Sequence, residues 1–434
     1  MNIPLDCLYR FVDTIASEIY GDCIIIYRFW PHGSKNINNL TNLYKLEPDW
    51  YKKTIFPLIW CNDQEPLDYE FYKTQTEMTN DFASVLKSNN IFIPPKNLNF
   101  RNNIFEKGIL LHSEKRSRDL KKYQLDDELI PVYYWSHGII ARDWFRYAEH
   151  VTQKKQVQKT FLIYNRAWSG TREYRLQFIE SLIEANLQDC CQTTVSPIEP
   201  ELGVHYNTYQ FKNSVWKPTC VLENFFPSNT VPSHYSAEFD IADYEATDIE
   251  VVLETLFDDT RLHLTEKSLR PIACGQPFIL AGTYGSLEYL RSYGFKTFGH
   301  IWDEQYDLTE DPKERLIQIA DLMTQITNWA PGVREKKLDE AQAIADYNKQ
   351  HFFSRQFFNV IVNELKINLK TAFYELKQYN NYQSWIDRWN HYLSYPEVTK
   401  YLNANQNLDY PTMEYVKQAM KLAQSQLTEI AIKK

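Results

Sequence analysis

The segment Thr265-Glu266-Lys267 combines residue types that can hold a phosphate group. Thr265 can cap a helix, which would place Glu266 and Lys267 in its first turn. Backbone N–H groups at a helix start carry partial positive charge, and a nearby lysine adds a full charge. An ordinary capped helix with exposed charges is the alternative. The apolar segment 277–280 and its glycine-flanked loop favour phosphate binding, because open α/β sheets bind ligands at the carboxyl ends of strands.

Two arginines are further candidate phosphate ligands. Arg172 and Arg175 lie at the start of a predicted helix, 172–187, which follows an apolar strand and an asparagine-containing loop at 160–168. The planar guanidinium of arginine can bind two phosphate oxygens at once. An exposed helix face with charges three residues apart is the alternative. Together with Lys267, these arginines predict an anion-binding site built from two distant segments.

Acidic residues follow a predicted strand in the first part of the chain. The apolar segment 54–61 predicts this strand, and Asp63 and Glu65 come directly after it. A carboxylate at the carboxyl end of a strand is well placed to accept a proton from a substrate hydroxyl group. Turn formation is the alternative role, because aspartate and the adjacent Pro66 both favour turns. Glu65 and Asp63 are therefore competing candidates for a general base.

Polar residues also follow the predicted strands 108–114 and 131–135. We expect these residues to face the same site and to contact a substrate or one another; they are Ser113, Glu114, His137, Arg142 and Asp143. For His137, a purely structural role is the alternative to orienting a substrate.

The candidates lie between alternating strand-like and helix-like segments, which is typical of a mostly parallel sheet covered by helices. This alternation continues to a polar segment, 151–159, which predicts a linker. A second α/β unit follows, with later strands expected at 249–257, 277–282 and 296–298. From about residue 310 onward the pattern is helical. The sequence therefore predicts two α/β domains followed by helices.

Residues 250–298 resemble the donor-binding half of the α1,3-fucosyltransferase-like glycosyltransferases. That family has an acidic residue at a strand end, then a Thr-Glu-Lys turn, a helix and an apolar strand. The counterparts here are Glu254, 265–267 and 277–280. Thr255 stands where the family has an asparagine, so the resemblance does not identify the donor sugar.

Two other segments carry a related resemblance. The same family has an arginine near the start of an earlier helix, and Arg175 is similarly placed, one turn after Arg172. The Asp-Gln-Glu-Pro turn at 63–66 resembles a turn in phage-type glycosyltransferases. The resemblance implies that the nucleotide sugar contacts six residues: Arg172, Arg175, Glu254, Thr265, Glu266 and Lys267. It also implies that Glu65 or Asp63 activates the acceptor.

The resemblance further implies a fold and an activity. The fold is GT-B, an α/β architecture of two Rossmann-like domains that face each other across a cleft. Here they would be 1–155 on the acceptor side and 156–345 on the donor side, with a helical extension at 346–434. The activity is transfer of a sugar, with inversion, from a UDP- or GDP-linked donor to a hydroxyl group, without a metal or cofactor. The acceptor is a glycan or a hydroxylated base of phage DNA.

Composition excludes several other classes. The formal net charge of −9 gives no overall attraction to nucleic acid or anionic membranes, although a local basic groove is still allowed. The seven cysteines lack zinc-ligand spacing, and neither a dinucleotide-binding nor a P-loop glycine motif is present. No signal peptide or membrane span is recognisable. We expect a protein of the cytoplasm of a bacterial or phage-infected cell; a non-catalytic protein that binds a nucleotide sugar or glycan is the alternative.

Overall fold

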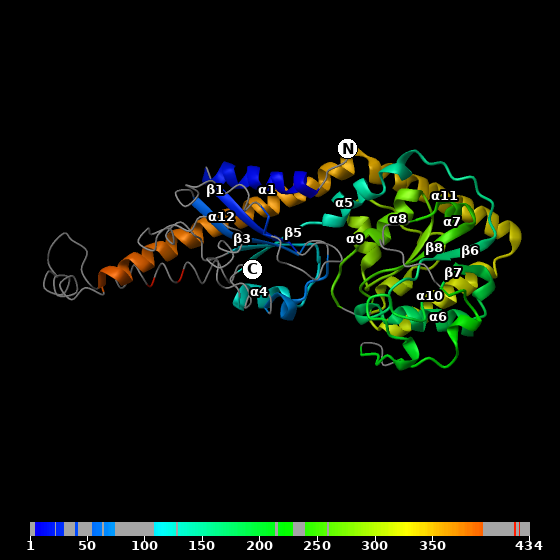
Figure 1. Ribbon diagram of the computed structural model, residues 1–434. Helices are drawn as coiled ribbons and strands as arrows, with labels where there is room; N and C mark the ends of the chain where they lie inside the picture. Colours follow the sequence, from blue (N-terminus) through cyan, green and yellow to red (C-terminus); the bar gives the residue numbers. More distant parts are fainter. Residues whose placement is uncertain are drawn as a thin grey trace.

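The structure is a computed structural model, shown in Figure 1. It describes residues 5–21, 23–29, 40–41, 54–62, 65–73, 108–126, 129–212, 216–228, 239–257 and 260–393, together with 421 and 425. Asp63, one of the two predicted bases, lies outside these residues.

The first sheet is mostly parallel, as the alternating pattern predicts. Its described strands follow the order β2-β1-β3-β4-β5, and only the edge strand β2 is antiparallel to its neighbour. The strands are β1 (Cys23–Phe29), β2 (Leu40–Thr41), β3 (Thr54–Asn62), β4 (Gly108–His112) and β5 (Leu129–Tyr133). Every residue of β4 is buried, which is typical of a central parallel strand covered on both faces. The described helices α1 (Leu5–Tyr20) and α4 (Leu120–Asp126) contact this sheet, while α5 (Ser136–Trp144) follows β5 and leads towards the second sheet (Figure 1).

The second sheet is parallel throughout its described strands, with the order β7-β6-β8-β9. These strands are β6 (Lys159–Ile163), β7 (Cys191–Thr193), β8 (Thr247–Leu253) and β9 (Phe278–Ala281). The helices between and beside them are α6 (Tyr174–Glu184), α7 (Ile241–Glu245), α8 (Glu266–Cys274) and α9 (Ser286–Ser292). The predicted α/β class with parallel sheets and covering helices is therefore confirmed.

The strand expected at 296–298 is not formed, so that prediction is wrong. The backbone of Lys296 instead bonds to the Asn348 side chain, donating its N–H at 2.8 Å and accepting at its carbonyl at 2.8 Å. Phe298 stacks on Trp302, with ring centres 4.7 Å apart. The apolar side chain of Phe298 therefore packs on Trp302 and does not belong to a strand of the sheet.

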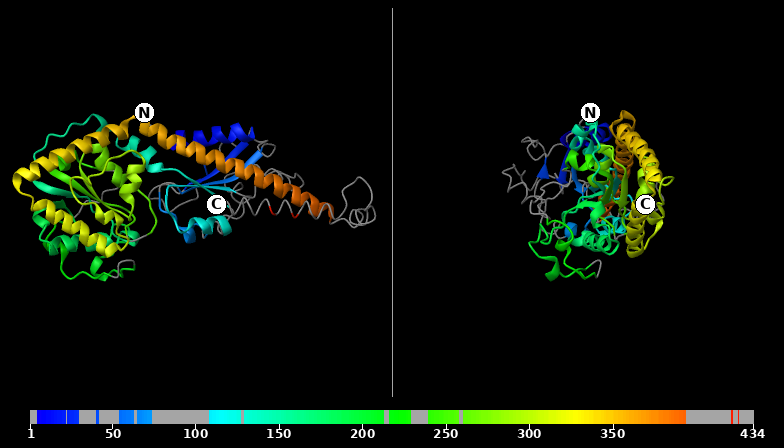
Figure 2. Two further views of the ribbon diagram at one scale, coloured as in Figure 1. Left: turned by 180° about the vertical axis from the view of Figure 1, so that it is seen from behind. Right: turned by 90° about the vertical axis from the view of Figure 1, so that its right-hand side faces the viewer.

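The last described part of the chain is helical, as predicted. It comprises α10 (Pro312–Thr327), α11 (Pro331–Phe353) and α12 (Arg355–Leu393). The helix α12 leaves the second sheet and runs beside α1 along the first (Figure 2). There the Tyr20 hydroxyl donates to the carbonyl of Phe373 at 2.7 Å, and Asn368 donates to that of Tyr133 at 2.8 Å. The expected domain boundary after residue 345 falls inside α11, whereas the one after 155 lies in an irregular segment.

One cluster of buried apolar side chains extends from the first sheet to the second. Between the sheets, Trp135 packs against Tyr289 and Tyr293 of the α9 region, with ring centres 5.1 and 4.7 Å apart. The ring centre of Phe357 in α12 lies 6.1 Å from that of the same indole. The two sheets therefore share a core at this point. None of the described helices is long and apolar enough to cross a membrane.

Candidate functional site

The loop after β4 and the segment before α8 meet at the carboxyl ends of the two sheets. We call this region, residues 113–116 and 260–268, the junction. The N–H of Lys115 donates to the carbonyl of Leu262 at 2.8 Å, and the N–H of Leu262 donates to that of Arg116 at 2.9 Å. Two segments far apart in the sequence thus form a short antiparallel bridge.

Side chains reinforce this bridge. Arg116 donates to the carbonyls of Thr260 at 2.6 Å and Tyr284 at 2.7 Å, and its guanidinium lies 3.9 Å from the ring centre of Tyr284. The indole N–H of Trp135 donates to the carbonyl of Leu264 at 3.0 Å. The ends of β4 and β5 are therefore held against the loops that follow β8 and β9.

The start of α8 is built around the buried carboxylate of Glu254. This residue directly follows β8 and is 0% exposed. Its carboxylate accepts hydrogen bonds from Thr265 N (3.0 Å), Thr265 Oγ1 (2.7 Å), Ser268 N (3.2 Å) and Ser268 Oγ (2.5 Å). Negative charge is stabilised at a helix N-terminus because the N–H groups there point outward without helical partners. Glu254 thus fixes the end of β8 to the start of α8.

Thr265 caps α8, as the sequence predicts, and its side chain accepts from the N–H of Lys267 at 3.3 Å. The N–H groups of Thr265, Lys267 and Ser268 are therefore occupied by protein side chains. This corrects the expectation that open backbone donors at this helix start would cradle a phosphate. The candidate phosphate ligand at this helix start is therefore the side chain of Lys267, not the backbone N–H groups.

Glu254→Ala is expected to lower the free energy of unfolding by about 2–4 kcal/mol, because it leaves buried donors without partners. Urea denaturation of the full chain measures this change. Glu288→Ala, which removes an exposed carboxylate from the first turn of α9, is the matched control and should be nearly neutral. Equal stability of Glu254→Ala and wild type would contradict the role of Glu254 in holding the start of α8.

Lys267 is positioned by carboxylate and hydroxyl groups. Its Nζ lies 2.7 Å from Glu266 Oε1 and 3.3 Å from Thr255 Oγ1, and its side chain is 13% exposed. The other oxygen of Glu266 lies 3.6 Å from Nδ1 of His137, at the start of α5. Both Glu266 and His137 are completely buried. A residue of the first half thus lies beside the carboxylate that holds Lys267.

His263 lies next to this group. Its Nδ1 is 3.2 Å from the Ser113 hydroxyl, and its ring centre is 5.4 Å from that of His137. Burial, and then His137, lower the pKa of His263 from 6.5 to about 3, while Glu65 acts in the opposite direction. His263 is therefore neutral at ordinary pH, and Glu65 is close enough to affect it electrostatically.

The segment that carries Glu65 is tied to the junction by Glu114. The Glu114 carboxylate accepts from the N–H of Leu67 at 2.6 Å and lies 3.4 Å from Arg261. Arg261 also donates to the carbonyl of Leu67 at 2.7 Å. Glu65 itself is half-buried. These contacts keep the predicted base beside the second half of the chain.

Arg175 lies inside the protein, where it is 3% exposed. Its guanidinium donates to the carbonyls of Ala167 (2.7 Å), Leu253 (2.8 Å) and Glu254 (3.1 Å), and burial lowers its pKa. These contacts tie the loop after β6 to the end of β8. Arg172 is half-buried and pairs with Glu201 at 3.4 Å. The two predicted phosphate ligands thus differ: Arg175 supports the end of β8, and only Arg172 is partly open to solvent.

Arg142 and Asp143 do not face the junction, which corrects the expectation for both. Arg142 donates to the carbonyls of Phe352, Phe353 (2.8 Å) and Ser354 (3.1 Å), so it satisfies the C-terminal end of α11. Asp143 pairs with Arg146 at 3.1 Å. Both residues lie in the last turn of α5, whereas His137 lies in its first, and an α-helix rises about 1.5 Å per residue.

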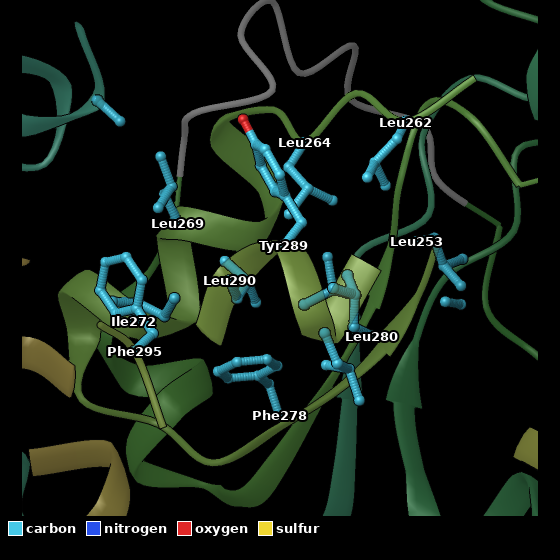
Figure 3. Close-up of a cluster of buried hydrophobic side chains, with 14 of the residues drawn as sticks. Leu253, Leu262, Leu264, Leu269, Ile272, Phe278, Leu280, Tyr289, Leu290 and Phe295 are labelled. Atoms are coloured by element: carbon cyan, nitrogen blue, oxygen red, sulfur yellow. The ribbon is translucent and has the colours of Figure 1, made fainter. Parts of the chain in front are cut away.

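The structure brings most of the predicted site residues together at or beside the junction: Glu65, Ser113, Glu114, His137, Glu254, Thr265, Glu266 and Lys267. It also adds Arg116, together with Arg261 and His263, which sequence reasoning did not select. Arg116 belongs to a basic segment, 115–122, whose lysines and arginines are candidate phosphate contacts in the sequence. For Arg261 and His263, a weak signal is their alternation with Leu262 and Leu264, which predicts an extended segment with one buried face, although the structure buries all four residues. Figure 3 shows Leu262 and Leu264, which flank His263, within the apolar cluster.

Comparison of the chain with models of protein families, with curated proteins and with solved structures yields no match. Within the described residues, no group of three or more His, Cys, Asp or Glu side chains is arranged to hold a metal ion.

Proposed function

We propose that the protein is a GT-B-type glycosyltransferase that moves a sugar from a nucleotide diphosphate donor to an acceptor hydroxyl group. The proposal retains the resemblance to α1,3-fucosyltransferase-like and phage-type enzymes, including transfer with inversion and without a metal ion. Its two halves would be the two parallel sheets, joined at their carboxyl ends.

The observation that carries this proposal is the convergence at the junction. Glu65, Ser113 and His137 come from the ends of three first-half strands, and Lys267 comes from the second half. Ligand sites of parallel α/β sheets lie at the carboxyl ends of strands, and here two such edges meet. Glu65 as a proton acceptor and Lys267 as a cation would lie on opposite sides of the junction, an arrangement that suits transfer of a sugar between two substrates.

In the proposed reaction, Glu65 accepts the proton of the acceptor hydroxyl group as its oxygen attacks the anomeric carbon of the donor. The bond between that carbon and the diphosphate oxygen breaks, and the nucleoside diphosphate leaves. Lys267 offsets the negative charge that develops on the diphosphate. Glu254 and Arg175 support Lys267 from within, since Arg175 bonds the carbonyl of Glu254 and the carboxylate of Glu254 holds the start of α8. Arg172 is a predicted second cation for the donor.

A non-catalytic protein that binds a nucleotide sugar or glycan is the second candidate. It is favoured by the burial of Arg175 and Glu254, whose hydrogen bonds are made to protein groups. A degenerate site of this kind would keep its fold and bind a ligand without turning it over.

A panel of UDP-, GDP- and dTDP-linked sugars tests the proposal. We expect one of them, at a concentration well above its Kd, to raise the melting temperature, because a ligand that binds only the folded state stabilises it by mass action. We also expect slow hydrolysis of that donor to release its nucleoside diphosphate. Binding without any release or transfer favours the second candidate, and the absence of binding by the whole panel overturns both.

A further inference from the structure

His263 has a buried nitrogen that lacks a hydrogen-bond partner among the described residues. The residue is 2% exposed and lies between β8 and α8, in the segment that crosses to the first half. Its Nδ1 contacts Ser113, at 3.2 Å from the hydroxyl oxygen and 3.4 Å from the carbonyl oxygen. Its Nε2 is buried and has no hydrogen-bond partner in the described part of the chain.

The contacts with Ser113 determine which nitrogen carries the hydrogen. A carbonyl oxygen can only accept, so the imidazole must donate from Nδ1 to bond the carbonyl of Ser113. Burial and the neighbouring His137 hold the pKa of His263 near 3, so the ring carries a single hydrogen at neutral pH. Nε2 is therefore a hydrogen-bond acceptor.

An acceptor that is buried without a partner is unusual in a folded protein, because its loss of water is not compensated. The charged groups near Nε2 of His263 do not supply the missing donor. Glu65, which affects His263 electrostatically, is an acceptor when ionised, and Lys267 Nζ is held by Glu266 and two hydroxyl groups. Nε2 has no donor among the described residues, and a hydroxyl group of a bound molecule would supply one.

We propose that Nε2 of His263 accepts a hydrogen bond from a hydroxyl group of the donor sugar. This inference rests on the proposed glycosyltransferase function. The donor sugar is favoured over the acceptor because His263 lies in the same junction segment as Lys267, the proposed diphosphate ligand, and the sugar is bonded to that diphosphate. His263 thereby selects sugars with a hydroxyl group at one position, since a site built to bond a hydroxyl group discriminates against an analogue that lacks it.

Two amide variants separate this role from a structural one. The side chain of His263→Asn places an N–H near Nδ1, which preserves the contact with Ser113, but has nothing at Nε2. The side chain of His263→Gln reaches the Nε2 position and offers a carbonyl acceptor there. Isothermal titration with the nucleotide sugar found by the panel, and with its nucleoside diphosphate, measures both variants.

We expect His263→Asn to weaken binding of the nucleotide sugar about tenfold, and His263→Gln to remain within about threefold of wild type. Affinity for the nucleoside diphosphate should stay within about twofold in both variants, because that ligand lacks the sugar. Undiminished binding by His263→Asn, or equal losses for both ligands, overturns the inference and assigns His263 a structural role.

Two further measurements keep the outcome interpretable. If His263→Asn does not fold, as judged by its thermal transition, the wild type is titrated with deoxy analogues of the same nucleotide sugar. At least one deoxy position should then cost about tenfold in affinity, and uniform affinity across the analogues overturns the inference. If the wild type binds neither nucleotide sugars nor nucleoside diphosphates, the proposed function itself fails and the inference fails with it.

Discussion

Glu65→Gln is expected to reduce sugar transfer about 10²–10⁴-fold while donor binding is retained, because the amide cannot accept the proton of the acceptor hydroxyl group. The substitution preserves size and leaves the contacts of Glu114 with Leu67 and Arg261 in place. Initial rates at saturating donor, together with the donor Kd from titration, measure the two effects separately.

The matched control is Glu70→Gln, which neutralises an exposed carboxylate in the same segment and should leave transfer unchanged. Full activity of Glu65→Gln would shift the proton-accepting role to Asp63, and Asp63→Asn would then be expected to show the loss. A parallel loss of donor binding in Glu65→Gln would instead indicate that the residue supports the junction.

Lys267→Ala is expected to weaken nucleoside diphosphate binding about 10- to 100-fold, because it removes the cation proposed to face the diphosphate. The same change removes the ammonium group that lies 2.7 Å from the buried carboxylate of Glu266. We therefore expect stability to fall as well, by about 2 kcal/mol, which is less than for a completely buried pair because Lys267 is partly exposed.

A double variant separates these two effects. Lys267→Met combined with Glu266→Gln removes both charges and retains side-chain volume, so stability should recover towards that of wild type. Nucleoside diphosphate affinity should remain low, since the cation is still missing. Unchanged affinity in Lys267→Ala would place the diphosphate elsewhere, and recovery of affinity in the double variant would show that only folding had been affected.

The secondary structure was largely predictable, because its signals are local. The apolar runs at 54–61 and 277–280 and the cap at Thr265 extend over only a few residues, and the structure confirms the strands and the helix start. Where a local signal failed, a distant group was responsible. The segment 296–298 resembles a strand in composition, yet Asn348 of α11 takes both backbone hydrogen bonds of Lys296, and Glu304 accepts the N–H of Phe298.

The roles of charged residues were less predictable. Charged side chains can bind ligands or satisfy buried protein groups, and the sequence alone does not distinguish the two roles for Arg175, Glu254 and Arg142. In the structure, Arg175 and Arg142 bond main-chain carbonyls, and Glu254 accepts from the N–H groups of Thr265 and Ser268 at the start of α8. Each satisfies backbone groups that the end of a strand or helix leaves without partners, and that need becomes visible only once the elements are packed.

By itself, the sequence determined the parallel α/β class, the capped start of α8 and the set of polar residues that follow the strands. These properties depend on residue type and on spacing within one element. Only the tertiary structure decided that Ser113 meets His263 and that His137 meets Glu266. These pairs join residues more than a hundred positions apart, so they depend on how two sheets pack at their carboxyl ends, which no local pattern encodes. The same packing buries Nε2 of His263 without a hydrogen-bond partner among the described residues, and this observation carries the proposed contact with a donor sugar.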